Sequence, residues 1–256
     1  MNRPDRAIIL AAGRGSRMRD ATADRPKCLV PLAGRPLLEW QRASFNRAGI
    51  ATVAAVGGYR ADRLADEIDV PFVNPDWQTT NMVRSLTYAG AWLGERDTLI
   101  SYSDIAFRPS AVERLAAAPG DISITYDRQW AALWRGRFEA PLEDAETFRV
   151  EDGQVVEIGA RPDSMDEVEG QFMGLLKFTA AGWRTIRAHL DRLGQAATDR
   201  LDMTGLLRRL IADGHRVGGV PVDGGWVEVD SESDLTYYET MVNAAEHSTP
   251  WTHDWR

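Results

Sequence analysis

The sequence predicts an α/β protein built on a largely parallel β-sheet. Three observations support this prediction: short apolar runs of strand length alternate with helical segments through the first half of the chain, glycine or proline marks many of their boundaries, and 256 residues suffice for a substantial core. A strand, a helix and a second parallel strand form a right-handed unit, and repeated units build one sheet.

The first elements are well marked. A continuous apolar run at 7–11, bounded by turn residues, predicts a strand buried on both faces. A helix is predicted at 37–48, because Pro36 stands at its first turn and Gly49 lies just beyond its end. The same alternation then predicts strands at 51–56, 70–73, 98–102 and 121–126 and helices at 61–68, 81–93 and 109–118.

The alternation loosens after Tyr126. Residues on either side of Asp152-Gly153 alternate as in a β-hairpin, with strands at 148–151 and 154–158. Ser231, with Asp234 three residues later, forms a capping box that starts the last helix. Between them we expect strands at 171–178, 216–222 and 226–229 and helices at 180–193 and 199–212.

We find no repeat, low-complexity segment or linker, which predicts one domain. Residues 1–246 are expected to form it, with residues 121–225 elaborating the same sheet as an acceptor-binding part. Residues 247–256 are polar except for two tryptophans, and we expect them to be a disordered C-terminal tail; a contact with a partner is the alternative.

Composition excludes several classes of partner. The chain has 38 acidic and 30 basic residues, a net charge of −8, which argues against nucleic acid or an anionic membrane as partner. A small anionic ligand in a locally basic pocket is still allowed. The single cysteine, Cys28, cannot form an internal disulfide, and no apolar run near the N-terminus has membrane-spanning length, so we expect a cytoplasmic protein.

A glycine-rich turn, Gly13-Arg-Gly15, directly follows the first strand. Backbone N–H groups of such a turn can point at one anion, and open α/β sheets bind ligands at this end of their strands. The Gly-Lys-Ser/Thr of a Walker loop is absent, and Met18 stands where a dinucleotide fingerprint needs its third glycine. A turn that needs glycine only for its backbone angles is the alternative.

Three runs, Leu10–Met18, Pro26–Leu32 and Gly34–Leu37, together resemble the N-terminal signature of the nucleotidyltransferases. These enzymes attach a nucleoside monophosphate to a sugar phosphate or a small phosphorylated alcohol. The resemblance implies a Rossmann-like three-layer α/β/α fold with a mixed, mainly parallel sheet, a nucleoside triphosphate over the glycine loop, Mg²⁺, and pyrophosphate release. The nucleotide-binding residues that it implies in these runs are Leu10, Ala11, Ala12, Gly13, Arg14, Gly15, Ser16, Arg17 and Lys27.

Charged residues in these runs are assigned to catalysis. Only two of the 30 basic residues are lysines, Lys27 and Lys177, and a lysine in an arginine-biased chain suggests a need for a compact point charge, although chance is the alternative. In the nucleotidyltransferase frame, Arg17 and Lys27 neutralise the triphosphate. An acceptor phosphate is already anionic near neutral pH, so the reaction needs positioning and positive charge, to which Lys177 is also expected to contribute, rather than a catalytic base.

Asp104 and Asp230 each end a predicted strand, and the resemblance matches them to the family's two metal-binding aspartates. Hard oxygen ligands at rigid strand ends suit Mg²⁺. A turn cap at Asp104 and a helix-flanking role at Asp230 are the alternatives. The four histidines are scattered at 189, 215, 247 and 253, so zinc is not expected.

The segments 74–77 and 81–86 resemble the base-recognising part of the branch that uses CTP with phosphocholine or phosphonates. By this analogy Asn81 and Ser85 read the pyrimidine, with Gly58 and Ser103 also binding nucleotide. The alternative is a helix cap for Asn81 and a solvated Ser85.

Segments at 126–137, 144–146 and 171–178 are expected to bind the acceptor. Arginine or lysine there would hold phosphorus oxyanions, tryptophan would face a quaternary ammonium, and an acid would suit a primary amine; core packing is the alternative for each tryptophan. The expected acceptor-binding residues are Tyr126, Arg128, Trp130, Trp134, Arg135, Glu146, Met173, Gly174, Lys177 and Trp226.

The sequence thus predicts a Mg²⁺-dependent cytidylyltransferase that transfers CMP from CTP to a small phosphate or phosphonate, such as phosphocholine or 2-aminoethylphosphonate. A homodimer is compatible with the sequence. A sugar-1-phosphate nucleotidyltransferase that uses UTP or dTTP is the alternative enzyme. A nucleotide sensor without catalysis is the alternative from another class, and a dinucleotide oxidoreductase comes third.

Overall fold

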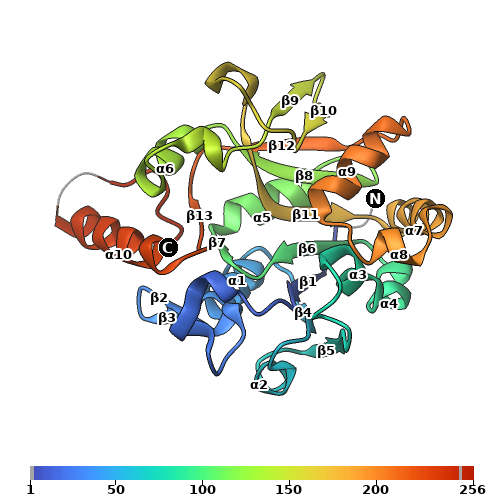
Figure 1. Ribbon diagram of the computed structural model, residues 1–256, viewed down its shortest axis with the longest axis horizontal. Helices are drawn as coiled ribbons and strands as arrows, with labels where there is room; N and C mark the ends of the chain where they lie inside the picture. Colours follow the sequence, from blue (N-terminus) through green and yellow to red (C-terminus); the bar gives the residue numbers. More distant parts are fainter. Residues whose placement is uncertain (1–2, 248–249) are drawn as a thin grey trace.

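The structure is a computed structural model that describes residues 3–247 and 250–256. Nine strands form its central sheet: β1 (Arg6–Ala11), β4 (Thr52–Gly57), β5 (Val70–Val73), β6 (Thr98–Tyr102), β8 (Ile122–Asp127), β9 (Phe148–Glu151), β10 (Gln154–Ile158), β11 (Gln171–Phe178) and β12 (Gly218–Val222). Their order is β5-β4-β1-β6-β11-β8-β12-β10-β9 (Figure 1). The first four are mutually parallel, and β11 runs antiparallel between β6 and β8. The predicted mixed, mainly parallel sheet is confirmed.

Helices cover both faces of the sheet. They are α1 (Leu37–Arg47), α2 (Ala61–Ala65), α3 (Met82–Thr87), α4 (Gly90–Glu95), α5 (Pro109–Ala117), α6 (Trp130–Arg137), α7 (Ala180–Leu193), α8 (Gln195–Thr198), α9 (Met203–Ala212) and α10 (Glu232–His247), with short 3-10 helices at Ser16–Thr22, Lys27–Leu29, Pro141–Glu143 and Met165–Glu167. Because successive residues of a strand face opposite ways, Ile9 joins the core under α1 and α5, and Ile8 joins the core under α3, α7 and α9. The result is a three-layer α/β/α arrangement.

Two small antiparallel ribbons flank the sheet. One pairs β2 (Pro31–Leu32) with β3 (Arg35–Pro36). The other pairs β7 (Ile105–Phe107) with β13 (Trp226–Glu228), so that Glu228 lies opposite Ile105. The N–H of Val229 donates to the carbonyl of Asp104 at 2.9 Å. This second ribbon therefore brings two distant parts of the chain to one place beside the end of β6.

Several predicted elements change where tertiary contacts intervene. The helix predicted at 81–93 divides into α3 and α4, and the one predicted at 199–212 begins only at Met203. The carbonyls of Asp199 and Leu201 accept hydrogen bonds from the N–H groups of Asn81 and Val83, so this stretch pairs with α3 instead of coiling. The capping box is confirmed, because Ser231 N–H donates to the Asp234 carboxylate at 3.0 Å. Helix α6 and strand β7 were not predicted.

The expectation of a disordered tail is wrong for residues 250–256, whereas residues 248–249 lie outside the described part of the chain. Trp255 is 1% exposed and packs edge-on against Trp40 of α1, with ring centroids 6.0 Å apart. His253 is also buried, and its Nε2 lies 2.9 Å from a carboxylate oxygen of Asp127 at the end of β8. Burial of these large side chains gives the short segment enough apolar contact to be held in place.

Candidate active site

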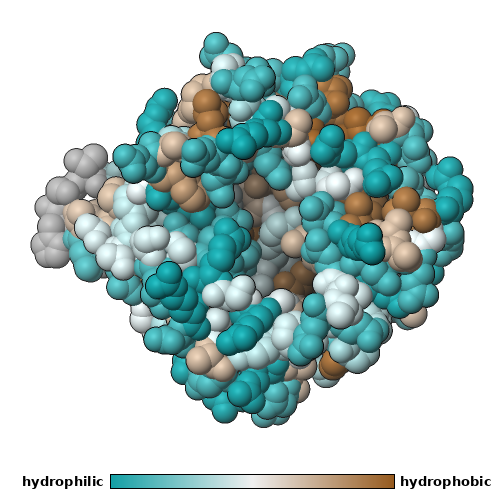
Figure 2. Space-filling view, viewed as in Figure 1, coloured by the Kyte–Doolittle hydropathy of each residue, from teal (hydrophilic) through white to brown (hydrophobic). Residues whose placement is uncertain are grey.

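The candidate site lies where the order in which the strands are added to the sheet reverses. The connection after β1 leads to β4 on one side, whereas β6 lies on the other side of β1, so the loops after β1 and β6 diverge and leave a crevice. Figure 2 shows the molecule hollowed near its centre, where Figure 1 places β6 and β11. A cavity of about 260 Å³ lies there and is lined by Leu10, Ala12, Gly13, Gly15, Arg17, Lys27, Trp77, Thr80, Asn81, Met82, Ser85, Tyr102, Ser103 and Asp104.

The glycine loop presents free backbone donors to this cavity. Within the described residues, the N–H groups of Gly13, Arg14 and Gly15 donate no hydrogen bond to another protein group. Gly15 has a left-handed φ of 67°, and a β-carbon on it would lie 3.1 Å from the side chain of Lys27. Glycine is therefore favoured at this position for two reasons: the backbone of the turn is left-handed there, and the aliphatic part of Lys27 packs directly against it. The loop can bind an anion without first breaking an internal hydrogen bond.

Lys27 joins the two predicted metal-binding aspartates. Its Nζ lies 2.8 Å from Oδ2 of Asp104 and 2.8 Å from Oδ1 of Asp230. Arg17 also reaches Asp230, at 2.8 Å. Burial alone would lower the pKa of Lys27, but the carboxylates of Asp104 and Asp230 outweigh that effect and raise the pKa to about 12. The lysine is thus a fixed positive charge at neutral pH.

A third carboxylate, Glu228, completes the cluster and was missed from the sequence. Carboxylate oxygens of Asp104, Glu228 and Asp230 all lie within 4.8 Å of one another. Burial, and next the neighbouring Asp230, raise the pKa of Glu228 to about 8, although Arg137 opposes the shift. The Glu-x-Asp spacing was the available signal, because alternate residues of an extended segment share one face.

The cluster fits a magnesium ion. Oδ1 of Asp104 is buried and has no hydrogen-bond partner among the described residues, which is costly for a carboxylate unless a cation meets it. Three carboxylates on strand ends provide the hard oxygen ligands that Mg²⁺ prefers. Asp104, Glu228 and Asp230 are therefore the side chains that would hold the ion.

Arg137, the last residue of α6, contacts this cluster from the protein interior. It lies in the segment 126–137 that was expected to bind the acceptor, and its contact with the carboxylates was not predicted. Its side chain is fully buried and contacts Glu228 at 3.1 Å, Asp230 at 3.4 Å and Asp234 at 3.0 Å. The guanidinium lies over the rings of Trp134 and Phe138, 5.0 and 4.8 Å from their centroids. No local pattern marks Arg137, because its role depends on the packing of a helix that was not predicted.

In the segments that were expected to recognise the base, the capping alternative for Asn81 holds. Its Oδ1 accepts the N–H of Met82 at the start of α3, although the residue also lines the cavity. Ser85 is buried rather than solvated, and its hydroxyl accepts a hydrogen bond from Asn74 at 3.0 Å. Gly58 permits a close approach, because a β-carbon there would lie 2.6 Å from the carbonyl oxygen of Ala12 and from Cβ of Trp77.

The prediction that Lys177 contributes positive charge to the site is wrong. Lys177 pairs with Leu99 near the start of β6 and with Ser123 near the start of β8, and its ammonium donates to the carbonyl of Ala118. Because β11 runs antiparallel to its neighbours, its last residues lie at the edge of the sheet opposite the crevice. Lys177 therefore cannot contribute charge to the candidate site.

Most of the other predicted acceptor-binding residues lie in the core or on the surface. Trp130, Trp134, Met173 and Trp226 are each at most 3% exposed, so the packing alternative holds for the three tryptophans. Arg128 forms an exposed ion pair with Asp223, Arg135 is exposed on α6, and Tyr126 packs against Phe148. Gly174 lets the ring of Tyr102 approach. Glu146 is half-buried and is not among the residues that line the cavity.

Comparison with known proteins decides the family. Residues 7–162 match the MobA-like NTP transferase domain. The chain belongs to this family. As a MobA-like NTP transferase, it is a nucleotidyltransferase, and the glycine loop, Lys27 and Asp104 all fall within the matched residues.

Relatives of this MobA-like NTP transferase extend the likeness beyond the matched region. The CTP:phosphoglutamine cytidylyltransferase of Campylobacter jejuni is 34% identical over 245 residues, which cover 90% of this chain and 97% of that protein. The CMP-5'-(3-aminopropyl)phosphonate synthase of Streptomyces rubellomurinus is 31% identical over 90% of this chain and 38% of its own length. The structure of the inositol-1-phosphate CTP transferase from T. maritima superimposes with a TM-score of 0.74 at 21% identity, over 97% of this chain and 99% of that one, and shows the same fold.

Proposed function

We propose that the protein is a Mg²⁺-dependent cytidylyltransferase that transfers CMP from CTP to a small phosphate or phosphonate acceptor. One observation carries the proposal. Lys27 and Arg17 contact a cluster of three carboxylates at the ends of β6 and β13. The free N–H groups of the glycine loop line the same cavity as these two cations. The use of CTP is supported by the two relatives, a CTP:phosphoglutamine cytidylyltransferase and a CMP-aminopropylphosphonate synthase.

Each of the site residues has a definite task in this reaction. The N–H groups of Gly13–Gly15 and the guanidinium of Arg17 bind the terminal phosphates of CTP, where negative charge accumulates as pyrophosphate leaves. Lys27 holds Asp104 and Asp230 and, because its pKa is about 12, keeps its proton throughout. When bound to Asp104, Glu228 and Asp230, Mg²⁺ would supply further neutralisation of phosphate charge.

No catalytic base is required for bond formation. An anionic oxygen of the acceptor attacks the α-phosphorus of CTP, a new P–O bond forms, and the bond from that phosphorus to the bridging oxygen of the β-phosphate breaks. Pyrophosphate leaves with the electron pair of the broken bond, and no proton is transferred. The described site matches this demand, because it gathers fixed positive charges and metal-type ligands instead of a nucleophile beside a base.

Two further expectations accompany the proposal. We propose that the chain acts as one domain in the cytoplasm, that residues 250–256 belong to it as well as the expected range 1–246, and that Cys28 stays a buried thiol there. The homodimer stays a prediction. Among the helices of residues 3–247 and 250–256, none combines the length and the apolar character that crossing a bilayer would require.

A pyrophosphate-release assay tests the proposed activity. The purified protein is given CTP, UTP, dTTP or ATP together with phosphocholine, 2-aminoethylphosphonate, 3-aminopropylphosphonate, phosphoglutamine or glucose 1-phosphate. We expect turnover with CTP and an amine-bearing acceptor, loss of turnover with EDTA, and recovery with Mg²⁺. Asp104→Asn and Asp230→Asn should each lower kcat by at least about 100-fold while circular dichroism is unchanged, since each removes a metal-binding oxygen.

The matched control is Asp66→Asn, an exposed aspartate at the end of α2, which should leave kcat unchanged. Best turnover with UTP and glucose 1-phosphate would instead establish a sugar nucleotidyltransferase. Tight CTP binding without pyrophosphate from any acceptor would establish a sensor.

A further inference from the structure

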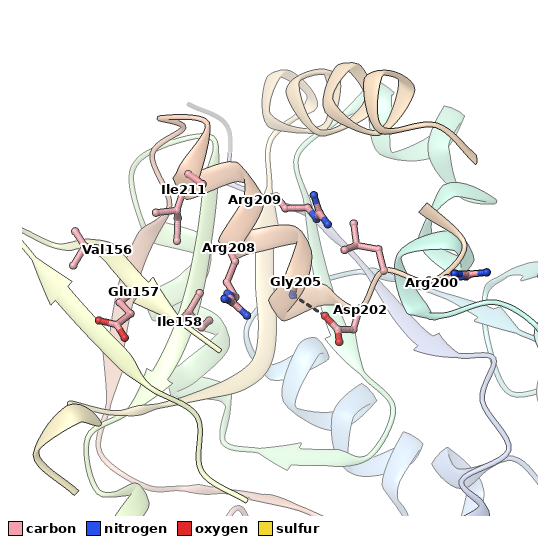
Figure 3. Close-up of a pocket in the computed structure, with 11 residues that line it drawn as sticks. Val156, Glu157, Ile158, Arg200, Asp202, Gly205, Arg208, Arg209 and Ile211 are labelled. Carbon is pink, nitrogen blue, oxygen red and sulfur yellow. Dashed lines mark hydrogen bonds between the residues drawn. The ribbon is translucent and has the colours of Figure 1, made fainter. Parts of the chain in front are cut away.

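A second cavity lies between α9 and β10 and has a volume of about 690 Å³ (Figure 3). Arg208 of α9 points toward the β10 side of this groove, and Asp202 lies at the beginning of the same helix. Arg209, which also lines the groove, points to the other side of α9. The groove is thus lined by both cationic and anionic side chains.

A backbone hydrogen bond connects this groove to the cavity beside the glycine loop. The segment before α9 is held against α3, because Asn81, which lines the cavity beside the glycine loop, donates its backbone N–H to the carbonyl of Asp199 at 2.7 Å. The residues that follow Asp199, namely Arg200, Leu201 and Asp202, line the groove. The two cavities are therefore linked through one pair of hydrogen-bonded segments.

Arg208 is held in place yet keeps most of its donors free. Its aliphatic stem packs beside Gly159, where a β-carbon would lie 3.2 Å from Cδ of Arg208 and 2.1 Å from Cγ2 of Thr204, one turn earlier in α9. One guanidinium nitrogen donates to the carbonyl of Gly159 at 3.3 Å. In the part of the chain that the structure describes, Arg208 forms no ion pair. Its fork can bind a carboxylate in two-point contact.

Asp202 lines the groove, and Glu146 lies beside it, because the next residue, Thr147, exchanges backbone hydrogen bonds with Gly159 and Ala160. Burial raises the pKa of Glu146, and the neighbouring Asp202 raises it further, whereas Thr204 and Arg208 oppose the shift. Neither carboxylate forms an ion pair with a described residue, and Asp202 uses one oxygen to cap α9 at the N–H of Gly205. Two carboxylates without an ion pair of their own can bind a ligand that brings an ammonium group.

We propose that the acceptor is an amino-acid-type phosphate or phosphonate, whose α-carboxylate is bound by Arg208 and whose α-ammonium is bound by Glu146 and Asp202. This inference rests on the proposed cytidylyltransferase activity and adds the class of acceptor to it. An α-amino acid carries both charges on one carbon, and the guanidinium of Arg208 forms no ion pair with Glu146 or Asp202 among the described residues. An acceptor without the carboxylate would lack the two-point contact with Arg208.

Pairs of acceptors that differ only in the carboxylate test the inference. One pair is 2-amino-4-phosphonobutyrate and 3-aminopropylphosphonate, and the other is O-phosphoserine and phosphoethanolamine. With CTP and Mg²⁺, kcat/KM should be at least about tenfold higher for the member of a pair that carries the carboxylate, as expected for one charge-assisted two-point contact.

Variants then assign the residues. Arg208→Leu should remove this preference and leave kcat/KM for the members that lack the carboxylate, and the KM for CTP, within about twofold. Glu146→Gln should lower kcat/KM for both members of each pair, because both carry an ammonium group. Arg47→Leu is the matched control, since it removes an exposed arginine of α1 that does not line this cavity, and the preference should persist.

Equal kcat/KM within both pairs would overturn the inference, as would an Arg208→Leu variant that lowers both members alike. Turnover of phosphocholine in preference to either pair would also overturn it while leaving the cytidylyltransferase activity intact. Absence of pyrophosphate with every nucleotide and acceptor would instead refute the proposed function itself.

Discussion

At the residue scale, the buried guanidinium of Arg137 decides how the acidic cluster is arranged. It contacts Glu228, Asp230 and Asp234, and it is shielded from water by the rings of Trp134 and Phe138. Buried carboxylates at such short separations would repel one another and lose their geometry without this cation. We therefore expect Arg137 to be a positioning residue, which acts on the proposed metal-binding side chains.

Replacing Arg137 by lysine should test this role. Arg137→Lys keeps the positive charge, but an ammonium group cannot bridge three carboxylates or lie flat between two aromatic rings. We expect the affinity for Mn²⁺, measured by calorimetric titration, and kcat each to fall by about 10- to 100-fold. Arg135→Lys, two residues earlier and exposed, is the control. Unchanged Mn²⁺ affinity in Arg137→Lys would contradict the positioning role.

At the element scale, local patterns were sufficient wherever an element is stabilised mainly by its own periodicity. The strands β5, β6, β9, β10 and β11 and the helix α7 have the predicted bounds. The errors fall where another element supplies the hydrogen bonds. Residues 199–202 read as the start of a helix, but their carbonyls are used by α3, and β7 exists because it pairs with β13.

The loop after β4 offers a test of close packing beside the cavity of the candidate site. Gly58→Ala would place a methyl group 2.6 Å from the carbonyl oxygen of Ala12 and from Cβ of Trp77, so we expect a loss of about 1–3 kcal/mol in the free energy of unfolding, measured with urea. Gly13→Ala is the matched control, because nothing lies within 4 Å of its β-carbon position.

Gly13→Ala should change the free energy of unfolding by less than about 0.5 kcal/mol. It should nevertheless weaken CTP binding, because Gly13 lines the cavity and its methyl group would stand where the triphosphate approaches the loop. A Gly58→Ala variant as stable as the wild type would show that the loop can move away, and would contradict the packing argument.

At the scale of the whole molecule, the last residues of the chain close a buried network around Asp127. One carboxylate oxygen accepts from Trp226 and contacts His253, each at 2.9 Å, and the other accepts the N–H groups of Gln129 and Gly224, each at 2.8 Å. Burial alone would raise the pKa of Asp127, but His253, Gly224 and Trp226 together lower it. The network ties the C-terminal segment to the central sheet.

Asp127→Asn should destabilise the protein in a pH-dependent way. Both oxygens of Asp127 face hydrogen-bond donors, so the NH₂ group of an asparagine would face donors at one of the two positions. At pH 7 we expect the free energy of unfolding to fall by about 2 kcal/mol or more. Because the folded pKa is lowered, the charged Asp127 stabilises the wild type above the unfolded value of about 3.9, and this contribution is lost as pH falls toward the folded pKa.

The difference in urea midpoint between wild type and Asp127→Asn should therefore narrow as the pH falls below about 4. Asp223→Asn, which removes only an exposed ion pair with Arg128, is the control and should cost less than about 1 kcal/mol. A difference that stays unchanged between about pH 5 and 3 would contradict the assigned role of Asp127.

The sequence by itself determined the alternation of strands and helices, the glycine loop after the first strand, and the lysine and two aspartates that its resemblance to nucleotidyltransferases matched to the site. These features are encoded locally, in periodicity, turn residues and motif spacing. Only the tertiary structure decided that Glu228 and Arg137 join the cluster, that Lys177 lies at the far edge, and that the C-terminal residues are buried. Those outcomes depend on contacts such as that between Lys27 and Asp230, 203 positions apart, whose energies arise only when the sheet has brought both residues together.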